Sequence, residues 1–357
     1  MAQYLEFKKV NDLIMHLPKR FLLLDISRWI AAIGVIGFHL GSGLVTWTEN
    51  LYLFVDFFFV LSGFVLASKF PTSMRREKIS KFLIQRFLRL APMTYTTLLF
   101  TIAIEIIVRF RNSNSEANSS PGVDISLPVI VNCLLLLQIF SPTALLLNYP
   151  LWSLSVEWAT NLILIPFVAC KDTFKLLLLL SFQLIAILVA LNEVSTPEWL
   201  SPMLRGLNGV LLGVLARKYF EKRVLNYPAW VGISSIGVIF PVFSYSSNFP
   251  LTLLSIPFAA FIISIARIEP TKPSLAAKKL ATFMGKNSFG IYVWHVPITG
   301  VLGILAARVL GEESIYSNNF YMQLILVTLV SIFVSFYIDL FLDRFIRKLS
   351  PLDKSKL

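Results

Sequence analysis

Long apolar segments separated by short polar or charged stretches follow one another along almost the whole sequence. A bilayer core about 30 Å thick requires roughly 20 apolar residues to be crossed by a helix, and most of these segments reach that length. The pattern therefore predicts an all-α polytopic membrane protein. The eleven candidate segments are 23–45, 51–69, 88–108, 125–142, 150–169, 174–191, 201–216, 229–245, 250–268, 285–309 and 320–342.

The charges of the connecting loops indicate that one of these segments does not span. If all eleven crossed the membrane, the basic loops 69–89 and 217–223 would lie on opposite sides, whereas basic loops belong in the cytoplasm. Treating segment 125–142 as re-entrant or as a buried half-helix removes the conflict. We therefore predict ten transmembrane helices plus one re-entrant segment, with both termini cytoplasmic. The polar interruptions that single out this segment are Pro128, Asn132, Gln138 and Pro142.

The same pattern divides the chain into three parts. Residues 1–22 combine lysines with apolar positions on one helical face, which predicts an amphipathic segment on the cytoplasmic surface. Residues 23–345 form the transmembrane domain, and residues 346–357 form a cytoplasmic tail. We expect a multi-pass protein of the inner (cytoplasmic) membrane.

Composition supports the membrane class. Hydrophobic residues make up 56% of the chain and charged residues 15%, and the mean hydropathy is +0.73. The net charge of +12 resides mostly in loops that flank helices, so it indicates topology and not a nucleic-acid partner. The two cysteines, Cys133 and Cys170, provide neither a disulfide framework nor metal-ligand spacing, and we expect no metal.

The first predicted span, "LDISRWIAAIGVIGFH", contains an arginine and a histidine. Arg28 and His39 are eleven positions apart, which places them on nearly the same helical face, roughly 16 Å apart along the axis. Charged side chains at bilayer depth cost about 3 kcal/mol each and usually face a protein interior or a wet cavity. These two residues are therefore candidates for a site along which an extended ligand lies.

Further polar residues occur in other predicted spans. Arg86 and Arg89 share a face at the cytoplasmic mouth of the third span, whereas Asp56 lies near the outer end of the second. Ser153 and Glu157, four positions apart, share a face in the outer half of segment 150–169. A later segment, "KNSFGIYVWHVPI", places three more on one face: Ser288, Tyr292 and His295.

These positions predict a separation by depth, with arginines in the cytoplasmic half and with carboxylates and histidines in the outer half. Guanidinium groups suit phosphates, and histidines beside carboxylates suit proton transfer. A ligand that carries phosphates at one end and a reactive group deep in the membrane satisfies both requirements. An acyl-coenzyme A has this form.

Simpler interpretations of each residue remain open at this point. Arg86 and Arg89 alone could be positive-inside anchors, and His39 could be a hydrogen-bonded packing residue. Asp56 could be solvated at the interface, whereas Glu157 lies deeper and is harder to explain in this way.

Five stretches, taken together and in order, resemble the acyltransferase-3 family of membrane acyltransferases. Arg28 and His39 match an arginine, ten residues and then a histidine, and Arg86 and Arg89 match its R-x-x-R motif. The five stretches are "LDISRWIAAIGVIGFH", "VDFFFVLSGFVLA", "RFLRLAP", "LWSLSVEW" and "MGKNSFGIYVWHVPI".

This resemblance implies a ten-helix membrane domain that moves a short acyl group, commonly acetyl, from cytoplasmic acyl-CoA to a hydroxyl. The acceptor is commonly a glycan sugar at the outer face, although antibiotics and lipids also occur. For this chain we expect an extracytoplasmic or lipid-linked glycan. We accordingly expect acetyl-CoA, or another short acyl-CoA, as the donor.

The residue roles follow as a hypothesis. Three arginines, Arg28, Arg86 and Arg89, are expected to bind the CoA phosphates and the pantetheine entrance, and His39 to act as general base or to carry the acyl group. Carboxylates Glu157 and Asp56 are expected to orient His39 or bind the acceptor. The residues expected to line the channel are Ser153, Tyr292 and His295.

The sequence departs from the family pattern in three respects. Ile26 replaces a common glycine before the first helix, and Asn208 replaces an acidic residue that follows Arg205. Many members also carry an extracytoplasmic esterase domain of the SGNH type, which this sequence does not show. We therefore expect the chain to act alone or with a separate extracytoplasmic transferase.

Two other classes of function are alternatives to acyl transfer. A secondary transporter or flippase could use the same titratable residues as a proton relay, although no internal repeat is detectable. A structural scaffold leaves the intramembrane titratable groups unexplained.

Overall fold

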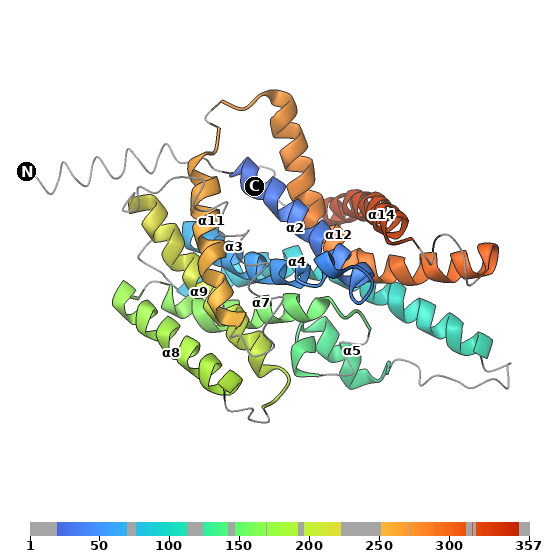
Figure 1. Ribbon diagram of the computed structural model, residues 1–357, viewed down its shortest axis with the longest axis horizontal. Helices are drawn as coiled ribbons and strands as arrows, with labels where there is room; N and C mark the ends of the chain where they lie inside the picture. Colours follow the sequence, from blue (N-terminus) through green and yellow to red (C-terminus); the bar gives the residue numbers. More distant parts are fainter. Residues whose placement is uncertain are drawn as a thin grey trace, which may run out of the picture.

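In the computed structural model, every regular element of the described part of the chain is a helix (Figure 1). The predicted N-terminal segment up to residue 19, the candidate span 229–245 and the end of the tail lie outside the described residues. The described residues are 20–69, 76–112, 124–141, 147–168, 170–191, 196–222, 251–270, 272–311, 316 and 319–349.

Ten α-helices and five short 3-10 helices occur in these ranges. The α-helices are α2 (Leu22–Gly41), α3 (Phe54–Lys69), α4 (Arg76–Asn112), α5 (Leu127–Leu134), α7 (Leu151–Leu164), α8 (Asp172–Leu191), α9 (Leu200–Lys222), α11 (Ser255–Arg267), α12 (Leu275–Leu310) and α14 (Phe320–Leu349). The 3-10 helices are η1 (Thr46–Thr48), η2 (Leu51–Leu53), η3 (Gln138–Phe140), η4 (Ile165–Phe167) and η5 (Leu251–Leu254).

Six helices in the described part are long and apolar enough to cross a membrane, which agrees with a multi-pass membrane protein. They correspond to six of the ten predicted spans. Helices α7 and α11 are shorter, with 14 and 13 residues. The eight residues of α5 extend only about 12 Å, less than the bilayer core, which agrees with the expectation that segment 125–142 does not span. The count of ten spans stays a prediction.

Helix α3 lies inside the bundle, where it packs against α2, α9 and α11, and most of its residues are buried. Glycines make its contact with α9 close: a Cβ added at Gly63 would collide with the carbonyl oxygen of Val210, and one at Gly213 with that of Val60. Small residues at helix contacts let backbones approach in this way. The close packing fixes the height of the polar residues that α3 and α9 carry.

Residues distant in sequence cap the N-terminus of α2. The carboxylate of Glu269, which follows α11, accepts hydrogen bonds from the backbone N–H groups of Leu22 at 2.6 Å and Leu23 at 3.0 Å. These amides have no partner within the helix, and the negative charge of the carboxylate also interacts favourably with the positive end of the helix dipole. The position of Arg28 is therefore tied to the loop between α11 and α12.

Helix α12 changes direction along its length, as Figure 1 shows, and contains Pro297 in its interior. Proline has no N–H to donate to the carbonyl four residues earlier, which is that of Val293. The side chain of Asn148 donates to this carbonyl instead, at 3.1 Å. The hydrogen bond from Asn148 thus also connects α12 to the segment that leads into α7.

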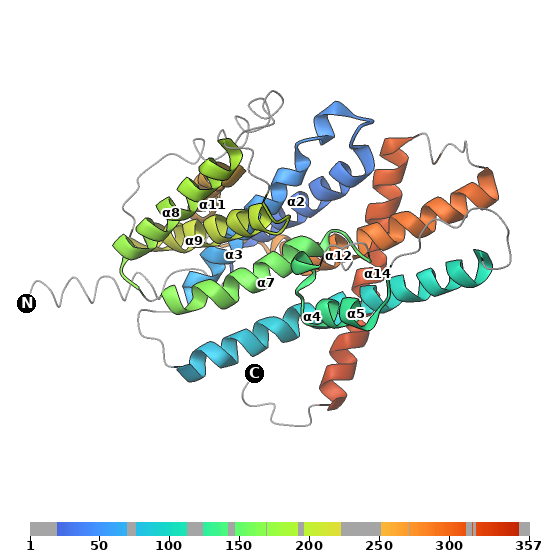
Figure 2. The same cartoon turned by 90° about the horizontal axis from the view of Figure 1, so that it is seen from below.

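The long helices α4 and α12 extend beyond the bundle at the same end of the molecule (Figures 1 and 2). Their other halves meet α2, α3 and α7, where the polar residues of the predicted site gather.

Candidate active site

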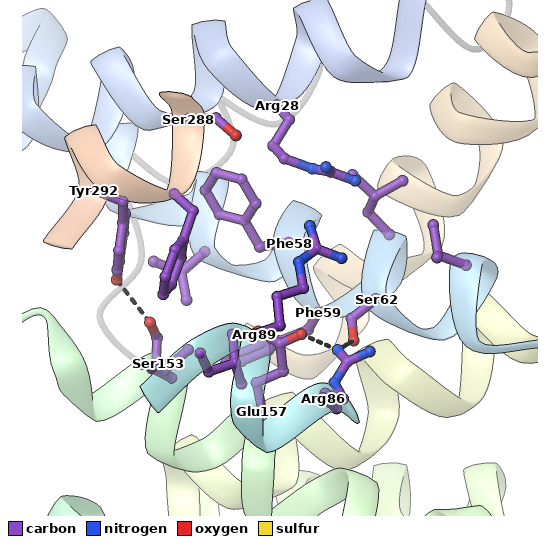
Figure 3. A pocket seen from close by; sticks show the side chains of 16 residues that line it. Arg28, Phe58, Phe59, Ser62, Arg86, Arg89, Ser153, Glu157, Ser288 and Tyr292 are labelled. Carbon is purple, nitrogen blue, oxygen red and sulfur yellow. Dashed lines mark hydrogen bonds and ion pairs between the residues drawn. The ribbon is translucent and has the colours of Figure 1, made fainter. Parts of the chain in front are cut away.

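A cavity of about 130 Å³ lies between α2, α3, α4, α7 and α12 (Figure 3). Six of the nine predicted site residues line it: Arg28, Arg86, Arg89, Ser153, Glu157 and Tyr292. Apolar walls come mainly from α3 and include Phe58 and Phe59. Among the described residues that line the cavity, the charged ones are three arginines and one carboxylate, which gives a formal excess of two positive charges. Such a cavity favours an anionic ligand.

Arg86 lies at the centre of the polar network. Its Nη2 donates to Ser62 Oγ of α3 at 2.6 Å and also forms an ion pair with Glu157 of α7. Its Nε is buried and has no hydrogen-bond partner among the described residues. A buried guanidinium donor without a partner is costly, so this side chain is suited to accept a further anionic group.

Arg28 and Arg89 reach into the same cavity from α2 and α4, as Figure 3 shows. Arg28 also makes a long ion pair, 3.4 Å, with Asp25 one turn earlier. Helices α2 and α4 therefore bring Arg28 together with Arg86 and Arg89, which lie almost sixty residues later in the sequence.

On the opposite wall, α7 and α12 are joined by hydroxyl groups. Ser153 Oγ lies 2.7 Å from the Tyr292 hydroxyl, which donates to the carbonyl oxygen of Pro150 at 3.0 Å. Pro150 immediately precedes α7, so the bonds fix the start of that helix against α12. Both side chains line the cavity, and their place in a channel stays a prediction.

His39 and His295 lie side by side although they come from α2 and α12. Their ring centroids are 5.1 Å apart with an interplanar angle of 33°. The Tyr292 ring is 5.9 Å from that of His295 and connects the pair to the cavity wall. Neither histidine lines the cavity itself.

Asp56 has a different surrounding from the one expected. Its two carboxylate oxygens accept hydrogen bonds from Arg205 Nε at 3.1 Å and Nη2 at 2.6 Å. The Arg205 guanidinium lies over the rings of Tyr52 and Trp152, at 5.8 and 5.5 Å. Asp56 is 2% exposed and is not among the residues that line the cavity, and both of its carboxylate oxygens are engaged by Arg205.

The predicted separation of charge by depth is wrong in one respect. Glu157 was expected in the outer half, away from the arginines and beside His39, but its carboxylate pairs with Arg86. Asp56 pairs with Arg205 in the same manner. A carboxylate in a low-dielectric interior is stabilised by the nearest cation, so arginine and carboxylate lie at one depth.

Two residues of this network, Arg205 and Ser62, lie outside the predicted site. The sequence does point to Arg205, because an arginine within an apolar helix is itself a signal of a buried partner. Ser62 carries no signal of its own, because serines commonly bond the backbone of their own helix.

The fold and the site define a multi-pass helical membrane protein with a positively charged cavity beside a histidine pair. The acyltransferase-3 family, described as an acyltransferase domain, matches residues 21–340. The chain belongs to this family. No solved structure matches the chain.

Three similar proteins illustrate the family. "Protein 2 in picA locus" of Rhizobium radiobacter is 30% identical over 186 residues, covering 49% of this chain and 97% of that protein. The peptidoglycan O-acetyltransferase OatA of Listeria monocytogenes is 27% identical, covering 77% of this chain and 49% of the relative. The O-acetyltransferase OatA of Staphylococcus aureus is 26% identical, covering 87% and 55%. The chain thus spans about half the length of these two O-acetyltransferases.

Proposed function

We propose that this chain is a membrane O-acetyltransferase that moves an acetyl group from cytoplasmic acetyl-CoA to a hydroxyl of an extracytoplasmic or lipid-linked glycan. The observation that carries the proposal is the cavity lined by Arg28, Arg86 and Arg89, with its excess of positive charge. Family membership supports acyl transfer, and the O-acetyltransferase relatives support a hydroxyl acceptor.

The donor is assigned to the arginine cavity. Phosphates of the CoA nucleotide bind the guanidinium groups, which form bidentate, permanently charged hydrogen bonds with them. Arg86 is the central contact because its Nε is an unpaired buried donor. From Arg28, α2 runs roughly 16 Å to His39, a distance comparable with an extended pantetheine arm. The thioester is therefore assigned to the neighbourhood of His39.

His39 is assigned the role of general base. It accepts the proton of the acceptor hydroxyl while the oxygen attacks the thioester carbonyl carbon. A carbon–oxygen ester bond forms, the carbon–sulfur bond breaks, and the proton passes from His39 to the departing CoA thiolate. Atoms and charge balance without a metal or a redox partner.

The carboxylates take different roles from those first expected. Glu157 balances the arginine cluster before the donor binds, because it already pairs with Arg86. Asp56 holds α3 to α9 through Arg205. Ser153 and Tyr292 line the path between the cavity and the histidines.

For topology we propose ten spans in the inner membrane, with both termini cytoplasmic and the arginine cavity opening toward the cytoplasm. The six candidate spans and the short α5 support this arrangement, as do the basic loops. A separate extracytoplasmic transferase remains the proposed partner for acceptors beyond the membrane.

The test is turnover of radiolabelled acetyl-CoA by the purified protein, measured as CoA release. We expect slow release from the wild type, loss of release in His39→Ala with donor binding retained, and weakened binding in Arg86→Ala. Arg109→Ala is the matched control, because Arg109 lies on the same helix α4 and pairs locally with Glu105 at 2.9 Å. A protein that neither binds nor consumes acetyl-CoA or succinyl-CoA would overturn the proposal and favour a transporter.

A further inference from the structure

The ring of His295 is held in one tautomer. Its Nδ1 lies 2.7 Å from the carbonyl oxygen of Tyr292, and because a carbonyl can only accept, Nδ1 carries the hydrogen. The other ring nitrogen, Nε2, is then an acceptor. His295 is completely buried, and Nε2 has no hydrogen-bond partner among the described residues.

The donor-bearing ring whose centroid lies nearest that of His295 is His39, at 5.1 Å, against 5.9 Å for Tyr292. Two imidazoles joined by an N–H···N hydrogen bond of about 2.9 Å have centroids roughly 5 Å apart, once about 1 Å is added for each ring. The two rings are therefore close enough for this bond, which is not formed in the structure and requires the His39 ring to turn its N–H toward Nε2. His39 is partly exposed, so its ring can rotate, whereas His295 is fixed by Tyr292 and by full burial.

We propose that His295 is the positioning residue of His39: its Nε2 accepts the N–H of His39 and thereby leaves the other His39 nitrogen free as the base. The part of this inference that concerns turnover rests on the proposed function. In catalytic histidines this orienting role commonly falls to a carboxylate. Here the cavity carboxylate, Glu157, is engaged by Arg86, and the orienting group is a neutral imidazole.

His295 does not serve as the base itself. It is 0% exposed and absent from the cavity lining, and its Nδ1 already donates to the backbone. The surrounding bonds hold it in place: Asn148 to Val293 at 3.1 Å, and Ser153 to Tyr292 at 2.7 Å, fix α12 against the start of α7.

The first experiment measures the chemical reactivity of His39 without any turnover. The chain has three histidines, so modification by diethyl pyrocarbonate can be followed at His39 by mass spectrometry, with His16 as internal reference. His295→Leu keeps similar volume but removes the acceptor, whereas His295→Gln keeps an acceptor oxygen. Thr299→Val is the matched control, because the Thr299 hydroxyl donates to the backbone carbonyl of His295, at 2.8 Å, and does not contact its ring nitrogens.

We expect His39 modification to slow about tenfold in His295→Leu and to stay within about twofold of wild type in His295→Gln and Thr299→Val. Equal rates in the Leu and Gln variants would overturn the proposal. A wild-type His39 that does not react would also overturn it, because an oriented, unprotonated base must react.

The second experiment separates kcat from KM for acetyl-CoA hydrolysis. His295→Leu should lower kcat about tenfold or more with an unchanged KM, and His295→Gln should restore most of the rate. In the background His39→Gln, the further change His295→Leu should have little effect, since a residue that acts through another adds nothing once that residue is lost. Additive losses, or a raised KM, would contradict the positioning role. Absence of wild-type turnover would count against the proposed function alone, and the modification experiment would still decide this inference.

Discussion

Two arginine–carboxylate pairs connect helices in the described part of this protein, and they are built differently. In the Asp56–Arg205 pair, two parallel hydrogen bonds join the groups, two aromatic rings cover the guanidinium, and both side chains are less than 10% exposed. In the Arg86–Glu157 pair one guanidinium nitrogen makes the contact, and the side chains are 13% and 23% exposed. Only the second pair lines the cavity.

This difference in burial and hydrogen bonding indicates that the two arginine–carboxylate pairs have separate roles. A buried ion pair is retained without destabilisation only when its geometry and hydrogen bonds are complete, as they are between Asp56 and Arg205. Arg86 instead keeps a buried Nε without a partner and has Arg28 and Arg89 in the same cavity. The first pair therefore stabilises the contact of α3 with α9, and the second is available to an anionic ligand.

The largest effect should come from breaking the Asp56–Arg205 pair. Asp56→Ala leaves Arg205 buried without its partner, and we expect a loss of about 3–5 kcal/mol in the free energy of unfolding in detergent. Replacing both groups, as Asp56→Leu with Arg205→Met, should recover most of it. Thermal unfolding of purified variants measures both, and a single variant as stable as wild type would contradict the structural role.

Arg86→Ala should affect ligand binding with little effect on stability. Removing its charged hydrogen bonds should weaken acetyl-CoA binding about 10- to 100-fold. Titration with labelled acetyl-CoA measures the dissociation constant, with Arg109→Ala as the control on the same helix. Equal affinities for the two variants would remove Arg86 from the donor site.

Glu157→Gln should change binding in the opposite direction. Neutralising this carboxylate raises the formal excess of positive charge in the cavity, so CoA affinity should increase by about 1 kcal/mol, roughly fivefold. The gain should shrink at high salt. The same titration at low and high salt checks it, and weakened binding would show that Glu157 itself contacts the donor.

The smallest effect should come from Ser62→Ala. This change removes the 2.6 Å hydrogen bond to Arg86 but leaves the pair with Glu157, so donor affinity should fall by only about 0.5 kcal/mol, roughly twofold. A loss as large as that of Arg86→Ala would mean that Ser62 contacts the donor directly.

Spacing along single helices predicted much of the site. Arg86 with Arg89, Ser153 with Glu157, and Tyr292 with His295 were expected on shared faces, and four of these six residues face the cavity as pairs from α4 and α7. Helical periodicity determines such relations because it is local. The helical class and the shortness of α5 followed in the same way from apolar length and interruptions.

Partners across helices could not be predicted. Whether Asp56 meets His39 or Arg205 depends on how α3 and α9 approach each other, which glycines such as Gly63 and Gly213 determine in three dimensions. Likewise, the pairing of His39 with His295 depends on how α12, which accepts a hydrogen bond from Asn148, packs against α2. Hydrophobic pattern indicates which face is buried, but not which residue of another helix lies against it.

The central claim is that the arginine cavity binds the phosphates of an acyl-CoA donor. Its most direct test is competition against labelled acetyl-CoA bound to the wild-type protein, using CoA and, separately, pantetheine, which lacks the phosphates. The account predicts that CoA competes, that pantetheine fails at the same concentration, and that the bound label is largely lost in Arg86→Ala. Equal competition by pantetheine, with undiminished binding to Arg86→Ala, would contradict it.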